Sequence, residues 1–299
     1  MLRIAVVGAN GMLGRDLVAA LATPGPGGPG SRFATVPFTR AELDITDPEL
    51  ALVTLDGFDV IVNCAAYNRV DDAESSEAAA AEAHAVNALG PEHLALAARA
   101  TGARLVHLST DYVFSGNEVA PYREGFPRNP KSVYGATKAA GEERALGAHR
   151  AGTAIVRTAW LYGEHGPSFP RTMLRLAAER ETVSVVTDQV GQPTWTGDLA
   201  SQLVRLIDAG VPAGIYHGTN SGETSWYGFA REVFRLAGLD PERVRPTDSA
   251  AFVRPAPRPA YSVLGHDGWA AVGVPAMRPW RDAIAAAIRS GTFSDARRH

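Results

Sequence analysis

The chain opens with "LRIAVVGANGMLGRDLVAALA" (residues 2–22), which predicts a strand, a turn and a helix in succession. Its first six residues predict a strand and include four uninterrupted apolar residues, and apolar residues return at helical spacing after the glycines. The glycines follow the pattern G-x-x-G-x-x-G, at Gly8, Gly11 and Gly14. Gly8 permits the tight turn, Gly11 lets a pyrophosphate approach the helix N-terminus, and Gly14 lets the helix pack closely on the sheet. The pattern therefore predicts a dinucleotide site, with glycines that only shape a turn as the alternative.

Strand-like and helix-like segments go on alternating through the first half of the chain. Residues 58–66 form a run that is apolar apart from Asp59 and Asn63, as expected for a parallel strand covered on both faces. Alanine-rich residues 72–101 predict helix interrupted at Gly90-Pro91. The other expected elements are strands at 32–38, 103–110 and 153–160 and a helix at 131–150. This alternation predicts an α/β fold, a Rossmann-like doubly wound parallel sheet with ligands at the carboxyl ends of its strands.

The pattern loosens after about residue 160. Further elements are expected there, namely helices at 168–180, 225–238 and 280–290 and short strands at 182–186 and 214–218. We expect a dinucleotide-binding domain at 1–160 and a smaller C-terminal substrate-binding lobe at 161–299, with some of the chain crossing back. The glycine- and proline-rich stretch 23–31 is interpreted as a flexible insertion at the sheet edge opposite the ligands.

Composition excludes several classes of function. Apolar residues make up 45% of the 299 residues and charged residues 20%, as in globular enzymes, and the formal net charge is -3. No basic cluster large enough for nucleic acid and no apolar stretch of membrane-spanning length is present, so neither partner is expected. We expect no signal peptide. Cys64 is the single cysteine and is interpreted as a buried structural residue, which favours a cytoplasmic protein.

The strand ends supply candidate cofactor contacts. Many NAD-binding folds place an acid after the second strand, to bind the adenosine ribose, but here Thr39 and Arg40 follow it. A hydroxyl and a guanidinium suit a ribose 2′-phosphate, which favours NADPH, although Asp44 nearby leaves NADH as the alternative. The loops after the third and fourth strands are expected to flank the cofactor through Ala65, Ala66, Tyr67, Ser109 and Thr110.

The segment "VYGATK" (133–138) holds the candidate catalytic pair. Tyr134 and Lys138 are four residues apart, which places them on one face of a helix. An ammonium beside a phenol lowers the phenol's pKa toward the working pH and can also bind the nicotinamide ribose. Thr110 ends a strand at the same edge of the sheet. Together the three residues predict a carbonyl-reduction site beside a nicotinamide, whereas the pair alone would indicate an ordinary helix surface.

Several longer blocks resemble the dTDP-4-dehydrorhamnose reductase family of the extended short-chain dehydrogenases. They run in order along nearly the whole chain: "GANGMLGRDL", "DVIVNCAAYNRVDDAE", "STDYVFSG", "PYREGFPRNPKSVYGATKAAGE", "VRTAWLYG", "VTDQVGQPTWTGDLA", "GIYHGTNSGETSWYGFA" and "RPAYSVL". The resemblance implies NAD(P)H-dependent reduction of the 4-keto group of a dTDP-4-keto-6-deoxyhexose, with dTDP-4-dehydro-L-rhamnose as the first candidate. Another dTDP-sugar 4-ketoreductase, such as one making a dihydrostreptose-type antibiotic sugar, is the main alternative.

The resemblance also assigns roles to residues. It implies catalysis by Thr110, Tyr134 and Lys138, and substrate contacts by Thr110, Asp111 and Trp160. It implies cofactor contacts by Met12, Leu13, Asp44, Ile45, Ala66, Tyr67 and Asn68. Trp160 also suits stacking on a sugar, although a core aromatic is its plain alternative.

Three further alternatives are weaker. A dehydratase of this fold carries Glu after the Thr-Asp pair, whereas Tyr112 stands here. A non-catalytic regulatory subunit would not need the complete Tyr134, Lys138 and Thr110 set. Some family members are metal-bridged dimers, and Asp16 and Asp198 stand at two such positions, but we interpret both as solvated or capping residues and predict no metal site. Mg²⁺ and the choice between monomer and homodimer stay open.

Overall fold

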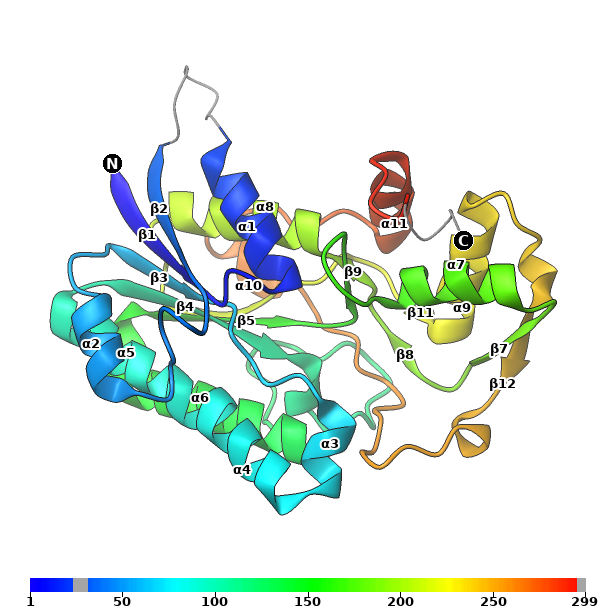
Figure 1. Cartoon of the computed structure of the whole chain (residues 1–299), viewed down its shortest axis with the longest axis horizontal. Coiled ribbons are helices and arrows are strands. Elements are labelled where there is room, and N and C mark those ends of the chain that lie inside the picture. The colour runs from blue at the N-terminus through cyan, green and yellow to red at the C-terminus, as the bar shows by residue number, and fades with distance from the viewer. Residues whose placement is uncertain (24–31, 295–299) are drawn as a thin grey trace.

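The computed structural model describes residues 1–23 and 32–294 and has a central sheet with helices on both faces (Figure 1). The insertion predicted at 23–31 lies, apart from Thr23, outside the described residues. The sheet is parallel throughout and has the order β10-β5-β4-β3-β1-β2. Its strands are β1 (Leu2–Val7), β2 (Phe33–Phe38), β3 (Val60–Asn63), β4 (Arg104–Thr110), β5 (Thr153–Thr158) and β10 (Gly214–His217). The order reverses between β1 and β3, which is where open parallel sheets bind ligands.

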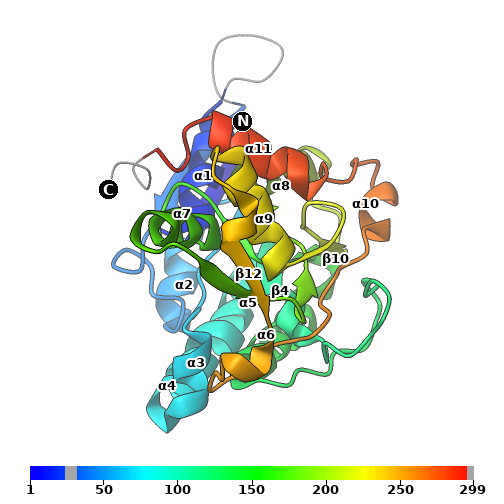
Figure 2. The same cartoon turned by 90° about the vertical axis from the view of Figure 1, so that its right-hand side faces the viewer.

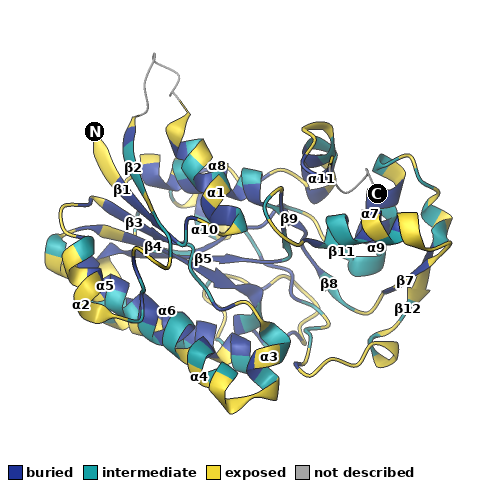
Figure 3. Ribbon diagram, viewed as in Figure 1, coloured by how far each residue is buried: buried dark blue, intermediate teal, exposed yellow. Residues whose placement is uncertain are grey.

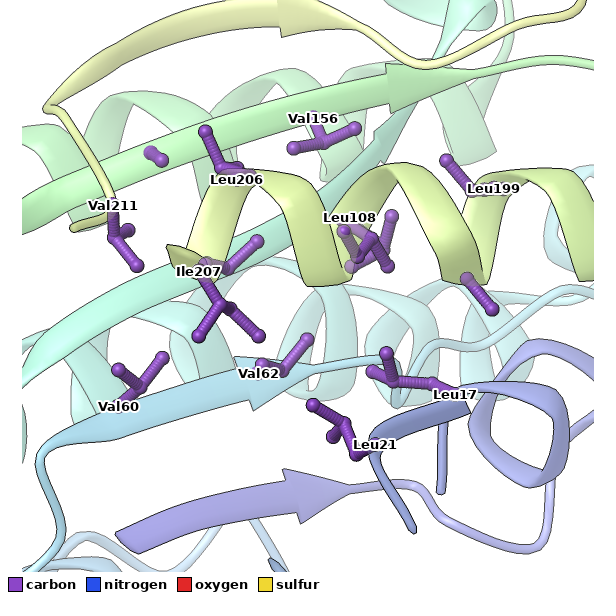
Figure 4. Packing of buried hydrophobic residues seen from close by; sticks show 14 of the residues in the cluster. Leu17, Leu21, Val60, Val62, Leu108, Val156, Leu199, Leu206, Ile207 and Val211 are labelled. Atoms are coloured by element: carbon purple, nitrogen blue, oxygen red, sulfur yellow. The ribbon is translucent and has the colours of Figure 1, made fainter. Parts of the chain in front are cut away.

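Two layers of helices cover the sheet. They are α1 (Met12–Ala22), α2 (Pro48–Thr54), α3 (Val70–Ser75), α4 (Glu77–His84), a π-helix η1 (Ala85–Leu89), α5 (Gly90–Thr101), α6 (Val133–His149), α8 (Thr196–Asp208) and α10 (Asp267–Ala270). Helices α1 and α8 pack on one face, where Leu199, Leu206 and Ile207 lie over the apolar side chains of β3, β4 and β5 (Figure 4). Helices α2, α5 and α6 cover the other face.

A smaller lobe extends from the carboxyl end of the sheet (Figures 1 and 2). It contains α7 (Phe169–Glu179), α9 (Trp226–Leu236), α11 (Trp280–Arg289) and three two-stranded pairs, β7 (Val183–Val186) with β12 (Val244–Thr247), β6 (Leu161–Tyr162) with β9 (Thr194–Trp195), and β8 (Val190–Gly191) with β11 (Thr224–Ser225). Its core is separate from the two sheet cores and is rich in aromatic side chains. Figure 3 shows the buried residues along the sheet and the inward helix faces.

The chain after residue 160 contributes to both parts of the molecule. Helix α8 was not predicted, although Leu199, Leu203 and Leu206 recur at helical spacing and are fully buried. The strand predicted at 214–218 belongs to the large sheet, where it pairs with β5 as the edge strand β10. Only the remainder of the second half forms the smaller lobe.

The alanine-rich segment breaks at a different place from the one predicted. Gly90 and Pro91 stay helical, whereas Ser76 is extended and separates α3 from α4. A proline has no N–H for the carbonyl four residues earlier, which here is Asn87. The π-helix 85–89 accommodates this loss, and the Asn87 carbonyl lies so close to Gly141 of α6 that a Cβ there would come within 2.0 Å of it.

Within residues 1–23 and 32–294, no helix combines the length and the apolar character needed to cross a membrane.

Candidate active site

The glycine turn after β1 can be built only from residues without a side chain. Gly8 has φ +78°, and a Cβ on it would lie 2.6 Å from the Ala65 nitrogen, in the segment that leaves β3. A Cβ on Gly14 would lie 2.4 Å from the Gly8 carbonyl oxygen. Gly11 is the N-cap of α1, and no side chain caps this helix end. The backbone therefore forms a cradle at an uncapped helix N-terminus, which fits the pyrophosphate of a dinucleotide.

A cavity of about 1040 Å³ runs from this turn along the ends of β4 and β5 to the smaller lobe. It brings together most of the predicted site, namely Gly11, Met12, Leu13, Gly14, Ala66, Asn68, Ser109, Thr110, Asp111, Tyr134, Lys138 and Trp160. These residues come from five separate segments of the sequence. Their convergence follows from the parallel sheet, which places every strand-to-helix loop at one edge.

A second cavity, of about 390 Å³, adjoins the first and shares Asn10, Gly11, Cys64, Ala66 and Asn68 with it. The remaining predicted cofactor residues line this second cavity: Gly8, Thr39, Arg40, Asp44, Ile45, Ala65 and Tyr67. Leu43, Ile45 and Val86 form its apolar side, which suits a purine ring. We call this cavity the adenosine pocket.

Tyr134 lies in the first turn of α6, which Ser132 caps by accepting a hydrogen bond from the Gly135 nitrogen at 3.1 Å. Burial raises the pKa of Tyr134 to about 12, and the Thr110 hydroxyl acts in the opposite direction. The phenol therefore keeps its proton at neutral pH and is a hydrogen-bond donor there. Its ring meets the Tyr112 ring edge-on, with the centroids 5.7 Å apart.

Lys138 lies one turn further along α6, and its Nζ donates a hydrogen bond to the Leu108 carbonyl oxygen at 2.6 Å. Burial lowers the pKa of Lys138 to about 8, opposed by the charge of Glu142. The side chain is therefore mostly an ammonium at pH 7. The predicted lowering of the Tyr134 pKa is wrong for this structure: burial is the largest cause and raises that pKa, and the opposing contribution comes from Thr110.

A buried ion pair behind these residues was not predicted. Glu142 accepts hydrogen bonds from Arg157 at 2.7 and 2.8 Å and from the Ser109 hydroxyl at 2.6 Å, and Glu142 and Arg157 are at most 1% exposed. Sequence spacing contained a signal, since Tyr134, Lys138 and Glu142 are each four residues apart. Glu142 thus ties α6, which carries Tyr134, to β5 through Arg157 and to the end of β4 through Ser109, next to Thr110.

Asp111 follows Thr110 directly and lies in the catalytic part of the cavity. The Thr110 hydroxyl donates to its Oδ1 at 3.0 Å. Burial raises the pKa of Asp111 to about 6, while the nearby Ser262 and Thr110 hydroxyls oppose the rise. Above that pH the carboxylate is an acceptor facing the same space as the Tyr134 phenol, as a sugar hydroxyl would require.

The smaller lobe adds two residues that the sequence did not identify. Trp226, at the start of α9, stacks on Trp160 with ring centroids 3.6 Å apart and an interplanar angle of 7°. Arg258 donates from Nη2 to Asp71 Oδ2 at 2.9 Å. Both Trp226 and Arg258 line the large cavity and also a third cavity of about 380 Å³ in the smaller lobe. Arg258 begins the block "RPAYSVL", but nothing in that block indicates its partner, which lies 187 residues away.

The other titratable candidates have ordinary partners. Asp198 forms a two-point ion pair with Arg278 at 2.6 and 2.8 Å, and Asp16 lies 3.6 Å from His165. Within the described ranges, no three His, Cys, Asp or Glu side chains are grouped as a metal ion would need. Burial raises the pKa of the Cys64 thiol to about 12, so that it stays neutral.

Comparison with known proteins gives a consistent set of relatives. The family model described as RmlD substrate binding domain matches residues 2–292. A dTDP-4-dehydrorhamnose reductase of Streptomyces griseus is 51% identical over 93% of this chain and 90% of its own length. A dTDP-4-keto-6-deoxy-D-glucose reductase of Streptomyces niveus is 48% identical over 95% of both chains. The crystal structure of a dTDP-4-dehydrorhamnose reductase of Bacillus anthracis in complex with NADP has a TM-score of 0.89 and 36% identity, over 97% of this chain and all of that one.

Proposed function

Because the chain belongs to the dTDP-4-dehydrorhamnose reductase family, we propose that it reduces the 4-keto group of a dTDP-4-keto-6-deoxyhexose. The first candidate substrate is dTDP-4-dehydro-L-rhamnose, and its product is dTDP-L-rhamnose. One observation carries the proposal: Thr110, Tyr134 and Lys138 line the same cavity as the glycine turn. Proton donor and dinucleotide cradle are thus combined in a space large enough for a nucleotide sugar.

We propose NADPH as the cofactor, with NADH as the alternative. The Bacillus anthracis relative was solved with NADP, and Thr39 and Arg40 line the adenosine pocket of this chain. The glycine turn would hold the pyrophosphate, and Lys138 would donate to the nicotinamide ribose. The cofactor, when bound, supplies the hydride for the sugar C4. The chain holds no grouped metal ligands in its described part, and the proposed reaction needs none.

The residues of the chain handle the proton. Tyr134 holds its proton at neutral pH and would donate it to the sugar O4. Thr110, whose hydroxyl donates to Asp111 in this structure, would turn that hydroxyl to the same sugar oxygen and polarise the carbonyl. The Lys138 ammonium, one helical turn away, would stabilise the phenolate that remains. Asp111 would accept a hydrogen bond from a neighbouring sugar hydroxyl, and Trp160 would pack against the sugar.

The nucleotide end of the substrate would lie toward the smaller lobe, which fits the proposed division between a domain at 1–160 and a mainly substrate-binding part at 161–299. Arg258 lies where the large cavity meets the third cavity, and a guanidinium at this position suits a diphosphate. Phe169, Met173, Phe252 and Trp226 supply apolar surface in the third cavity for a base.

A second candidate is reduction of another dTDP-4-keto sugar. The Streptomyces niveus relative acts, by its name, on a different sugar and is nearly as similar to this chain as the Streptomyces griseus one. Both substrates would use the same Tyr134, Lys138 and Thr110 chemistry, so the two candidates differ in the sugar alone.

The test is an assay of NADPH oxidation with a panel of dTDP-4-keto-6-deoxyhexoses, with the configuration at C4 of each product determined by NMR. We expect the highest kcat/KM with dTDP-4-dehydro-L-rhamnose. A higher value with another sugar would favour the second candidate. Binding of NADPH without turnover of any keto sugar would overturn both candidates and favour a non-catalytic role.

A further inference from the structure

Two arginines at the adenosine pocket share one carboxylate, that of Glu82 on α4. Glu82 Oε2 accepts a hydrogen bond from Arg69 Nη2 at 2.9 Å, and its Oε1 lies 3.5 Å from Arg40 Nη1. Arg40 comes from the loop after β2 and Arg69 from the loop after β3. All three residues line the pocket. Of the three, only Arg40 was predicted from the sequence, because nothing in the spacing of Arg69 and Glu82 links them to β2.

We propose that Glu82 determines cofactor selectivity by holding Arg40 and Arg69 together at the pocket and releasing them to the 2′-phosphate of NADPH. This inference rests on the proposed function, because it concerns the nicotinamide cofactor of that reaction. It assigns Arg69 as a second contact for the 2′-phosphate. It also assigns Glu82 as the counter-ion that limits the preference for NADPH, so that NADH can compete with NADPH for the pocket.

Arg69 is positioned for this role by a rigid neighbour. Its guanidinium lies over the Tyr67 ring, 4.6 Å from the centroid, and its Nε donates to the Tyr67 hydroxyl at 3.3 Å. The backbone of Tyr67 is held in turn by Asn87, through hydrogen bonds of 2.8 and 3.0 Å. Asn87 belongs to the π-helix η1, so the irregular turn in the alanine-rich segment has a consequence at the pocket.

Because both arginine side chains are exposed, they can exchange Glu82 for another anionic partner at little cost. Arg40 and Arg69 side chains are 73% and 61% exposed, and ion pairs of such groups contribute little because solvent screens them. A 2′-phosphate offers close to two negative charges and three acceptor oxygens, which suit the planar guanidinium donors. The phosphate can therefore replace Glu82 as the partner of both arginines.

The charge balance explains why Glu82 would limit the preference for NADPH. Arg40 also lies 3.6 Å from Asp44, and Arg69 lies 3.2 Å from Asp72. Two positive side chains thus face three negative ones, and the sum of these five is one negative charge, which disfavours a dianion. The change Glu82→Gln makes this sum zero and leaves the side-chain size unchanged.

Calorimetric titration with two nucleotide fragments tests the proposal without any sugar turnover. Adenosine 2′,5′-bisphosphate and adenosine 5′-phosphate differ only in the 2′-phosphate, so the ratio of their affinities measures its contribution. We expect Glu82→Gln to raise this ratio about three- to tenfold at low salt, and less at high salt. We expect Arg69→Gln to lower the ratio about tenfold or more, because a charge-assisted hydrogen bond to phosphate is lost.

Glu77→Gln is the matched control, because Glu77 is an exposed carboxylate on the same helix that lies outside the lining of the adenosine pocket. An equal rise in the ratio with Glu77→Gln would show a long-range charge effect and overturn the proposal. Weaker binding of both fragments by Glu82→Gln, with an unchanged ratio, would also overturn it, since Glu82 would then bind the ribose. Thermal unfolding of each variant checks the fold. Failure of the unmodified protein to bind either fragment would contradict the proposed function itself.

Discussion

Replacing Tyr134 by Phe removes a single oxygen atom from a side chain that is 8% exposed. The ring stays in place against Tyr112, so the fold and the cavity are expected to persist. The loss is then confined to the proton donor. With a pKa of about 12, the phenol is protonated throughout the neutral range, so the full contribution of the donor is lost at pH 7.

General acid catalysis contributes about 10²–10⁴-fold, which corresponds to about 2.7–5.4 kcal/mol of activation free energy. We therefore expect kcat for Tyr134→Phe to fall by that factor in the assay of NADPH oxidation at saturating keto sugar. NADPH binding, measured separately by fluorescence titration, is expected to change little, because the pyrophosphate and adenosine contacts lie elsewhere.

Tyr112→Phe is the control, since it removes a second phenol from the same cavity. Tyr112 lacks the four-residue spacing to Lys138, and its replacement should reduce kcat far less. A Tyr134→Phe variant that kept more than about a tenth of the original rate would refute the assignment of the donor. Equal losses in both variants would refute it too, because they would indicate a general effect on the cavity.

Three further predictions follow from the geometry. The value of kcat/KM should fall below about pH 6, where the Asp111 carboxylate gains a proton and stops accepting a hydrogen bond. It should also fall above about pH 8, where Lys138 loses its charge. Asp111→Asn should abolish the fall on the acid side. Gly8→Ala should lower the free energy of unfolding by at least about 1–2 kcal/mol in denaturant unfolding, since the φ of Gly8 is +78° and the added Cβ would meet the backbone of Ala65. Gly147→Ala should raise it by about 0.5–1 kcal/mol, because Gly147 lies on α6 with open space around it. Arg258→Met should raise KM for the nucleotide sugar about tenfold and leave KM for NADPH unchanged; the reverse pattern would place Arg258 at the cofactor.

Local chemistry made much of the fold predictable. A strand, a glycine turn and a helix follow from sterics and apolar periodicity within about twenty residues, and the α/β class follows from their repetition. The break in the alanine-rich segment was misplaced at glycine and proline, although Ser76 is a residue type that begins helices and caps α4 by accepting a hydrogen bond from the Ala79 nitrogen. Helix α8 was missed although its leucines show helical spacing.

The candidate site likewise has one part that the sequence predicted and another that only the tertiary structure decided. The spacing of Tyr134 and Lys138, and the position of Thr110 at a strand end, were visible in the chain, because helical and strand periods are local properties. Three features were settled only by folding: the contact of Trp226 with Trp160, the pairing of Arg258 with Asp71, and the carboxylate of Glu82 between two arginines. The direction of the Tyr134 pKa shift belongs with them. Burial and through-space charge depend on which distant segments pack together, and local sequence patterns do not specify that packing.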